Sequence, residues 1–240
     1  SSRGCPYGCK YCYRGAQGER KWHVRSARHL VEEIKEHTAK YGIAFKSWPD
    51  DNFAVTFKRI KELRDIIVAE GIKIPWGTHT RLDEAAGLKP NPAQSSKERN
   101  FFTDYIFEDP LRVNLMAEAG CRYIGFGPES AHLDTLEELG KGGFTTRAGL
   151  IPVSIDGRRY WFPKAMVYGI KHTMEAGIHS NCTWIMGNPS ETLERLKQTV
   201  AFMKWQIDYY ATFGIPEEAV NKNMFTLTWY PGTELINHPK

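Results

Sequence analysis

The pattern of hydrophobic and polar positions alternates along the chain between helical and strand-like periods. Apolar residues at helical spacing predict a helix of about four turns that Ser26 caps and Gly42 ends. The same spacing predicts five further helices, over 56–70, 110–119, 131–139, 163–176 and 190–209. Short apolar runs between them predict strands at the start of 43–53 and over 72–81, 121–127, 178–186 and 223–229.

Two segments break this alternation, and we interpret both as excursions from the core. Residues 87–109 are rich in Pro, Asn and Ser and carry an aromatic patch at Phe101, Phe102, Tyr105 and Phe107. Residues 143–162 contain an Asp156-Gly157 dipeptide, which is typical of a tight β-hairpin turn.

Repeated β–α alternation indicates parallel strands joined by crossover helices. We therefore predict an α/β fold, a partial (β/α)6 TIM-like barrel. Five of its strands are visible, and the first, largely missing, should end just before Cys5. The alternative is a doubly wound sheet. Both architectures place their chemistry at the carboxyl ends of the strands, where the most polar segments of this sequence fall.

Composition narrows the functional classes. The 240 residues suit one large domain, and the net charge of +4 comes from scattered basic residues, so nucleic-acid binding is not expected. No apolar run approaches the roughly 20 residues of a transmembrane helix, so we expect no membrane partner. The chain lacks a signal peptide and an initial Met, and we interpret it as an internal segment whose upstream part is missing.

The cysteines carry the strongest chemical signal. Three of the five lie at C-x3-C-x2-C spacing, as Cys5, Cys9 and Cys12, which favours a metal site in the reducing cytoplasm over a secreted disulfide framework. Structural zinc needs four protein ligands, and no fourth Cys or His follows at a matching distance. A [4Fe–4S] cluster held by three thiolates would leave one iron open. Cys121 and Cys182 lie in or beside predicted strands and are expected to be buried.

Further motifs accompany the cysteines in a characteristic order. They are PDDNF (49–53), WGTHTR (76–81), AGCRYIGFGPES (119–130), MGNPSET (186–192) and WYPGTEL (229–235). Together with SRGCPYGCKYC they resemble the radical S-adenosylmethionine (SAM) superfamily over nearly the whole chain, so that 1–240 would be its core domain. Within this superfamily, the cysteine motif is most similar to the branch whose members often carry an upstream cobalamin-binding domain. That branch includes methyltransferases and the oxygen-independent cyclases of chlorophyll synthesis.

The resemblance implies a reaction and its cofactors. SAM would bind the open iron of the cluster, and one electron from a donor such as flavodoxin or ferredoxin would cleave it to methionine and a 5′-deoxyadenosyl radical. That radical would start a methylation, C–C bond formation or cyclisation of a small-molecule substrate. Cobalamin would be held mainly by the missing upstream domain.

The resemblance also assigns roles by position. Cys5, Cys9 and Cys12 would hold the cluster, with the aromatic face of Tyr11 beside it. The residues expected to meet SAM or substrate are Asp50, Asp51, Asn52, Arg81, Gly125, Gly127, Glu129, Ser130, Gly187, Pro189, Glu191, Pro231 and Gly232. Two positions depart from the common family pattern: Pro128 replaces the Ile of G-I-E-S, and Ser190 replaces the second Gly of G-x-P-G-E-T.

Several alternatives remain at this stage. Asp50, Asp51 and Asn52 also fit a solvated turn, Glu129 and Ser130 a helix cap, and Arg81 a surface ion pair. For the whole protein, a methylthiotransferase would need a second cluster on upstream cysteines. The remaining alternative is an Fe–S or zinc module without SAM chemistry.

Overall fold

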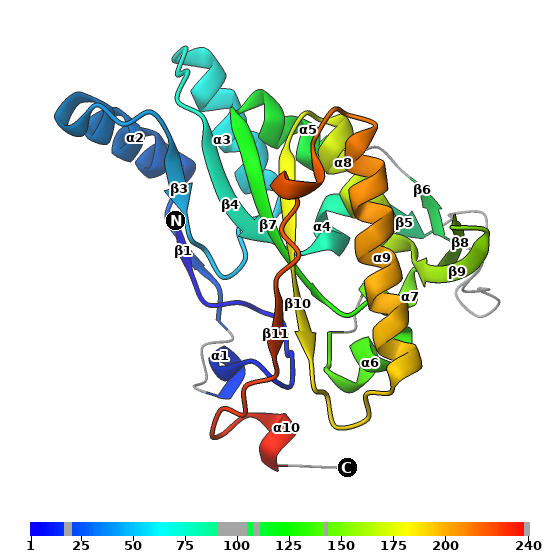
Figure 1. Cartoon of the computed structure of the whole chain (residues 1–240). Helices are drawn as coiled ribbons and strands as arrows, with labels where there is room; N and C mark the ends of the chain where they lie inside the picture. The colour runs from blue at the N-terminus through cyan, green and yellow to red at the C-terminus, as the bar shows by residue number, and fades with distance from the viewer. Residues whose placement is uncertain (17–20, 91–104, 108–110, 142–143, 238–240) are drawn as a thin grey trace.

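The protein is described from a computed structural model, which covers residues 1–16, 21–90, 105–107, 111–141 and 144–237. Its centre is a parallel sheet of five strands in the order β11-β10-β7-β4-β3. These strands are β3 (Lys46–Trp48), β4 (Trp76–Thr80), β7 (Cys121–Glu129), β10 (His179–Met186) and β11 (Met224–Thr226). The sheet is curled, and helices cover one of its faces (Figure 1). The predicted α/β half-barrel is confirmed.

The covering helices connect the strands in chain order, as the periodicity predicts. They are α2 (Ala27–Tyr41), α3 (Phe57–Ala69), α5 (Leu111–Glu118), α8 (Lys164–Glu175) and α9 (Leu193–Ala211). Local signals set the ends of α2, because the Ser26 hydroxyl accepts the His29 N–H at 3.2 Å and Gly42 adopts a left-handed conformation. The prediction that α9 starts at Ser190 is wrong. Thr192 is its cap, accepting the Arg195 N–H at 3.3 Å.

Smaller elements lie at the periphery of the sheet. They are α1 (Tyr13–Ala16), α4 (Leu82–Ala86), α6 (Leu133–Glu138), α7 (Phe144–Arg147), the 3-10 turn η1 (Glu217–Ala219) and α10 (Glu234–Asn237). The strand expected before Cys5 exists as β1 (Ser2–Arg3), but it pairs antiparallel with β2 (His23–Val24) and does not join the described sheet. None of the helices in the described ranges is long and apolar enough to cross a membrane.

Both excursions contain antiparallel pairs. In 87–109, β5 (Leu88–Pro90) pairs with β6 (Tyr105–Phe107), whereas Phe101 and Phe102 of the predicted aromatic patch lie outside the described residues. In 143–162, β8 (Leu150–Ile155) and β9 (Arg158–Pro163) form the predicted hairpin. Its turn residues Asp156 and Gly157 have φ of 49° and 76°, as a type I′ turn requires.

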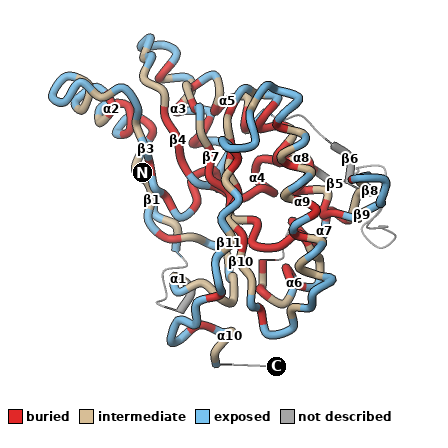
Figure 2. The backbone as a smooth tube through the Cα atoms, viewed as in Figure 1, coloured by how far each residue is buried: buried red, intermediate tan, exposed pale blue. Residues whose placement is uncertain are grey.

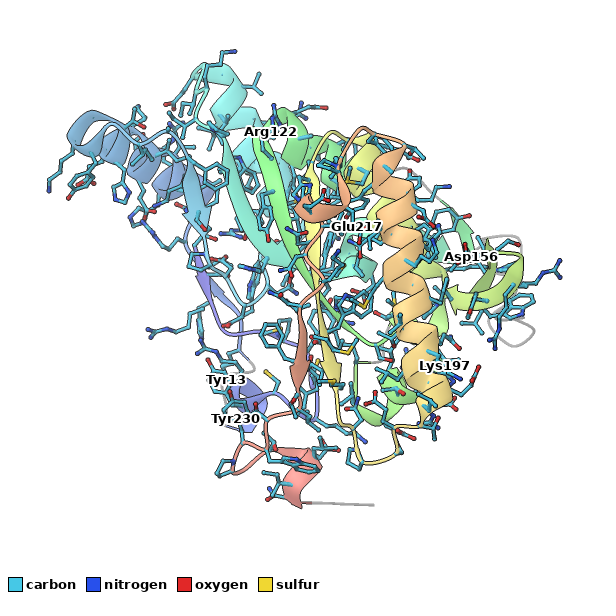
Figure 3. The ribbon with its side chains drawn as sticks, in the orientation of Figure 1. Tyr13, Arg122, Asp156, Lys197, Glu217 and Tyr230 are labelled. Carbon is cyan, nitrogen blue, oxygen red and sulfur yellow. The ribbon has the colours of Figure 1, made fainter. Side chains whose placement is uncertain are left out.

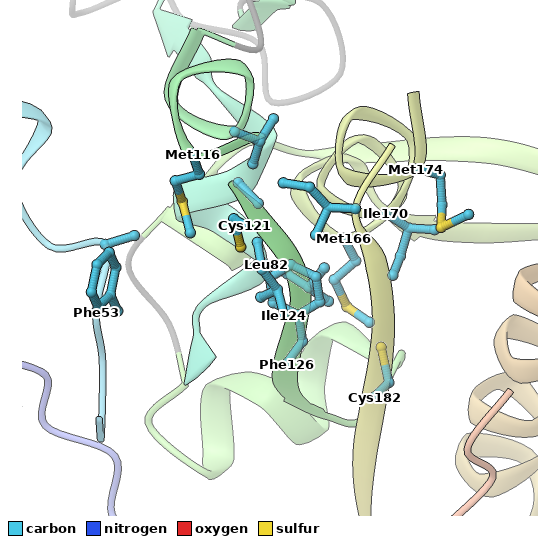
Figure 4. Close-up of a cluster of buried hydrophobic side chains, with 14 of the residues drawn as sticks. Phe53, Leu82, Met116, Cys121, Ile124, Phe126, Met166, Ile170, Met174 and Cys182 are labelled. Atoms are coloured by element: carbon cyan, nitrogen blue, oxygen red, sulfur yellow. The ribbon is translucent and has the colours of Figure 1, made fainter. Parts of the chain in front are cut away.

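The core lies between the sheet and its helices, where the buried residues concentrate along the strands (Figure 2). Ile124 and Phe126 of β7 and Cys182 of β10 pack with Met166 and Ile170 of α8 (Figure 4). Cys121 and Cys182 are fully buried, which confirms their predicted place in the core. The sheet presents its carboxyl edge to the cysteine loop.

Candidate functional site

A cavity of about 330 Å³ lies at the carboxyl ends of the strands, between the sheet and the cysteine loop. Ten predicted site residues line it: Cys5, Cys9, Tyr11, Cys12, Asp50, Asp51, Arg81, Gly125, Gly127 and Glu129. The loop that carries the cysteines lies between β1 and α1, beside the carboxyl ends of β10 and β11 (Figure 1). Residues far apart in the sequence therefore share one cavity.

The cysteine loop is fixed by its backbone. The Lys10 N–H donates to the Leu139 carbonyl at 2.9 Å, and the Lys10 carbonyl accepts the Leu235 N–H at 3.0 Å. Within the loop, the Cys12 N–H donates to the Cys9 carbonyl at 3.1 Å. All three cysteines have intermediate exposure, and burial raises the pKa of the Cys5 thiol. The loop thus presents three sulfur donors to one cavity.

Two tyrosines tie this loop to the sheet. The Tyr7 hydroxyl donates to Glu84 at 2.9 Å, and the Tyr11 hydroxyl donates to Glu129 at 2.8 Å. Burial, reinforced by these carboxylates, raises the pKa of both phenols, so both remain hydrogen-bond donors at neutral pH. Tyr7 and Glu84 were missed at the sequence level, because their pairing depends on a contact 77 residues apart.

Arg81 occupies the wall next to Cys9. Its guanidinium donates to Asp83 through Nε at 2.9 Å and Nη2 at 2.7 Å, and Nη1 lies 4.0 Å from the Cys9 sulfur. Its Cζ lies 4.0 Å from the centre of the Tyr7 ring. Burial alone would lower the pKa of Arg81, but the charge and hydrogen bonds of Asp83 raise it. The surface ion pair considered for Arg81 is wrong, since only 6% of the residue is exposed.

Glu129 has an unusual backbone. Its φ is 67°, in the left-handed region that disfavours residues other than glycine. Its carboxylate accepts Lys141 Nζ at 3.0 Å and the Tyr11 hydroxyl, so two partners hold the strained residue in the cavity wall. Gly127 makes room for it, because a Cβ there would lie 2.6 Å from Glu129 Oε1.

Ser130 lies in the turn before α6 and does not cap that helix, whose N-cap is His132. Its hydroxyl accepts the His132 N–H at 3.1 Å and lies 3.2 Å from the Thr199 hydroxyl. It is 2% exposed and does not belong to the cavity lining. The Glu-Ser pair is thus divided between the cavity and the turn that leads to α6.

The acidic segment after β3 lies partly in the cavity lining and partly outside it. Asp50 and Asp51 line the cavity, where Asp50 accepts the Ser2 hydroxyl at 2.6 Å and Asp51 accepts Arg14 Nε at 3.2 Å. Asn52 is fully buried outside that lining and donates to Glu84 at 2.9 Å. Asn52 therefore fixes Glu84, which in turn accepts Tyr7.

The far wall of the cavity is polar, and sequence reasoning missed it. Its residues are His79, Tyr123, Asn181, Thr183 and Asn221. The His79 ring fills the space of an absent side chain, because a Cβ on Gly125 would lie 2.4 Å from its Cδ2. The parallel register that pairs His79 with Gly125 could have indicated this contact, had the sheet order been known.

The remaining predicted residues lie outside the lining of this cavity. The Gly187 N–H donates to the Glu191 carboxylate at 2.6 Å, and both follow β10 with the exposed Pro189. Pro231 and Gly232 form an exposed turn after Tyr230. The ring of Tyr230 lies 5.6 Å from that of Tyr13 near the cysteine loop (Figure 3).

Comparison with known sequences gives consistent results. A family model described as the Radical SAM superfamily matches residues 1–203. An uncharacterized methyltransferase of Pyrococcus horikoshii is 28% identical over 235 residues, covering 98% of this chain and 40% of its own length. The anaerobic magnesium-protoporphyrin IX monomethyl ester cyclase of Cereibacter sphaeroides is 24% identical over 210 residues, covering 86% of this chain and 28% of its own length. The chain spans less than half the length of these relatives.

Solved structures resemble the fold. The cobalamin-dependent SAM radical enzyme OxsB, with aqua-cobalamin and SAM bound, superimposes with a TM-score of 0.65 at 16% identity, over 98% of this chain and 34% of its own. The radical SAM methyltransferase TsrM from Kitasatospora setae, with cobalamin and a [4Fe–4S] cluster bound, gives a TM-score of 0.62 at 18% identity, over 98% of this chain and 35% of its own. At such identities the likeness concerns the fold alone, and it favours the half-barrel over a doubly wound sheet.

Proposed function

The chain belongs to the radical SAM superfamily, and on that premise we propose that its cavity binds a [4Fe–4S] cluster and SAM and cleaves SAM reductively. One observation carries the proposal: the three cysteine thiols of one loop line the same cavity as Arg81, Glu129 and Lys141. The thiols supply three donors for a cluster, and Arg81 and Lys141 place positive charge in the same cavity.

The donor set fits a cluster better than a single ion. Within the described ranges, no group of three or more His, Cys, Asp or Glu side chains is arranged around one metal ion. In a cubane each thiolate binds a different iron, so its three cysteines stand further apart than ligands of one ion. Cys5, Cys9 and Cys12 would hold such a cluster, whose bound chemistry is one-electron transfer to SAM.

The remaining residues of the cavity would bind SAM and the substrate and orient them. Lys141 and Arg81 supply positive charge for a carboxylate, and Glu129 and Asp51 supply acceptors for an amino group or hydroxyls. The polar far wall, which includes His79 and Asn181, faces the space left for a substrate. Because Tyr7 and Tyr11 fix the loop from both sides of Cys9, little reorganisation is needed when the ligands bind.

The relatives refine the reaction class. They include methyltransferases and a cyclase of tetrapyrroles, and the structural neighbours OxsB and TsrM carry cobalamin. We therefore propose methylation or C–C bond formation on a small molecule, with cobalamin held mainly by a part of the protein outside this chain. A reductant such as flavodoxin or ferredoxin would supply the electron.

The test is release of 5′-deoxyadenosine from SAM after anaerobic reconstitution with iron and sulfide and reduction by dithionite. Cys12→Ala should abolish release, whereas the matched variant Cys121→Ala, which removes a buried thiol outside the cavity, should keep it. A reconstituted and reduced wild-type protein that leaves SAM intact would refute the proposal. Methylated cobalamin in the intact protein would support the methyltransferase class.

A further inference from the structure

We propose that the buried pair Arg81–Asp83 sets the reduction potential of the cluster in the cysteine loop. This inference rests on the proposed function, because it requires a cluster on Cys5, Cys9 and Cys12. It assigns Arg81 a role other than holding a ligand, and it assigns Asp83, which no motif singled out, a positioning role.

Arg81 places a fixed cation close to a cysteine sulfur in the described cavity lining. Its Nη1 lies 4.0 Å from the Cys9 sulfur, and its Cζ stands 4.0 Å from the Tyr7 ring centre. Nη2 also donates to the Lys141 carbonyl at 3.1 Å and lies 3.3 Å from the Thr145 hydroxyl oxygen. A guanidinium held by this many contacts cannot swing away, and its burial keeps water from screening the charge.

Asp83 determines how strongly the positive charge of Arg81 acts on the Cys9 sulfur. Its two carboxylate oxygens take two guanidinium hydrogen bonds, and Oδ2 also accepts the Thr145 hydroxyl at 2.9 Å. Burial alone would raise the pKa of Asp83, but Arg81 outweighs this and lowers it, so the carboxylate stays ionised at neutral pH. The pair is close to neutral as a whole, and its positive end is the one near Cys9.

Other charges of the wall are paired among themselves. Lys141 contacts Glu129 at 3.0 Å, and Arg14 contacts Asp51 at 3.2 Å. Removal of either member of the Arg81–Asp83 pair therefore leaves one uncompensated buried charge next to the cluster.

The sign of each effect follows from electrostatics. Reduction adds an electron to the cluster, so a nearby cation stabilises the reduced state and raises the potential, and an anion lowers it. Arg81→Gln should shift the potential to more negative values, because Asp83 is left as a bare anion. Asp83→Asn should shift it to more positive values. The double variant removes both charges and should return the potential toward the wild-type value.

The experiment is a redox titration of the reconstituted intact protein, followed by the electron paramagnetic resonance of the reduced cluster without substrate. Arg81→Lys keeps the charge but loses the planar fork, and it should stay closer to the wild-type potential than Arg81→Gln. Glu118→Gln is the matched control, because it breaks the ion pair between Arg64 of α3 and Glu118 of α5, before the amino end of β7. Circular dichroism and iron content verify the fold and cluster of each variant.

The outcomes separate the two proposals. Opposite shifts in Arg81→Gln and Asp83→Asn, with none in Glu118→Gln, support the inference. Shifts of the same sign, or potentials unmoved in variants that carry a normal cluster, overturn it and leave the proposed function standing. If Arg81→Gln loses its cluster, Asp83→Asn against Glu118→Gln decides the sign. A wild-type protein that forms no cluster overturns the proposed function and this inference with it.

Discussion

Gly169→Ala should destabilise the protein even though alanine is the better helix former. Gly169 lies in α8 where this helix crosses α4, and an added Cβ would stand 2.4 Å from the Leu82 carbonyl oxygen. Real Cβ contacts essentially never fall below 3.0 Å. The clash is with backbone, so the two helices have to separate by roughly 0.6 Å because no side chain can rotate away.

Two opposing terms set the magnitude. Alanine in a helix interior gains about 1 kcal/mol over glycine. Overpacking that shifts backbone costs about 1–3 kcal/mol, and we expect the upper end because a carbonyl oxygen is the clashing atom. The net loss is then about 2 kcal/mol. For a chain of this size that corresponds to a fall of roughly 4–8 °C in the unfolding midpoint Tm.

The effect should also reach the site. Leu82 lies between Arg81 and Asp83, so displacement of α4 moves the charged pair beside Cys9. We expect weaker SAM binding and lower iron retention in Gly169→Ala, measured by calorimetry and iron assay. The control is Gly42→Ala, where φ is +62° and no atom lies within 4 Å of the added Cβ. Left-handed strain should cost about 1–2 kcal/mol there and leave the site intact. If Gly169→Ala matches or exceeds wild-type stability, helix propensity outweighs packing and the reasoning is refuted.

Two further substitutions test single contacts. Burial alone would raise the pKa of Glu33, but Lys46 and Arg25 lower it from 4.5 to about 2. The stabilisation from this carboxylate is therefore present above pH 4.5 and is lost as the pH falls through about 2, so Glu33→Gln should differ from wild type in urea unfolding much less at pH 2 than at pH 7. Gly125→Ala places a Cβ 2.4 Å from the His79 ring, which can turn aside, so the imidazole NMR signals should move with little loss of Tm. Unmoved signals would contradict the placement of His79.

Local rules predicted the parts of the fold that local forces determine. Ser26 and Gly42 bound α2, and Asp156-Gly157 forms the hairpin turn, because caps and left-handed turns depend on a few neighbouring residues. The wrong prediction for the start of α9 also concerns a helix cap. Ser190 and Thr192 are both capping residues, and the Ser190 hydroxyl binds Glu138 instead. A side chain from another helix decided between them.

The residues of the candidate site also fall into those that local sequence predicts and those that it does not. The cysteine spacing and the Glu129 motif could be found from sequence, because the residues of each motif are close in the chain. Lys141, Tyr7 and Glu84 could not, since each acquires its role only when the half-barrel brings distant segments together.

Glu84 belongs to none of the sequence motifs, yet it becomes part of the site in the fold. It lies in α4, a short helix that the sequence pattern did not predict. In the fold it accepts hydrogen bonds from Tyr7, from Asn52 and from Thr80, so one buried carboxylate joins the cysteine loop to the ends of β3 and β4. Buried carboxylates persist only where donors compensate them. A buried carboxylate thus receives a tyrosine of the cysteine loop twice, Tyr7 at Glu84 of α4 and Tyr11 at Glu129 of β7.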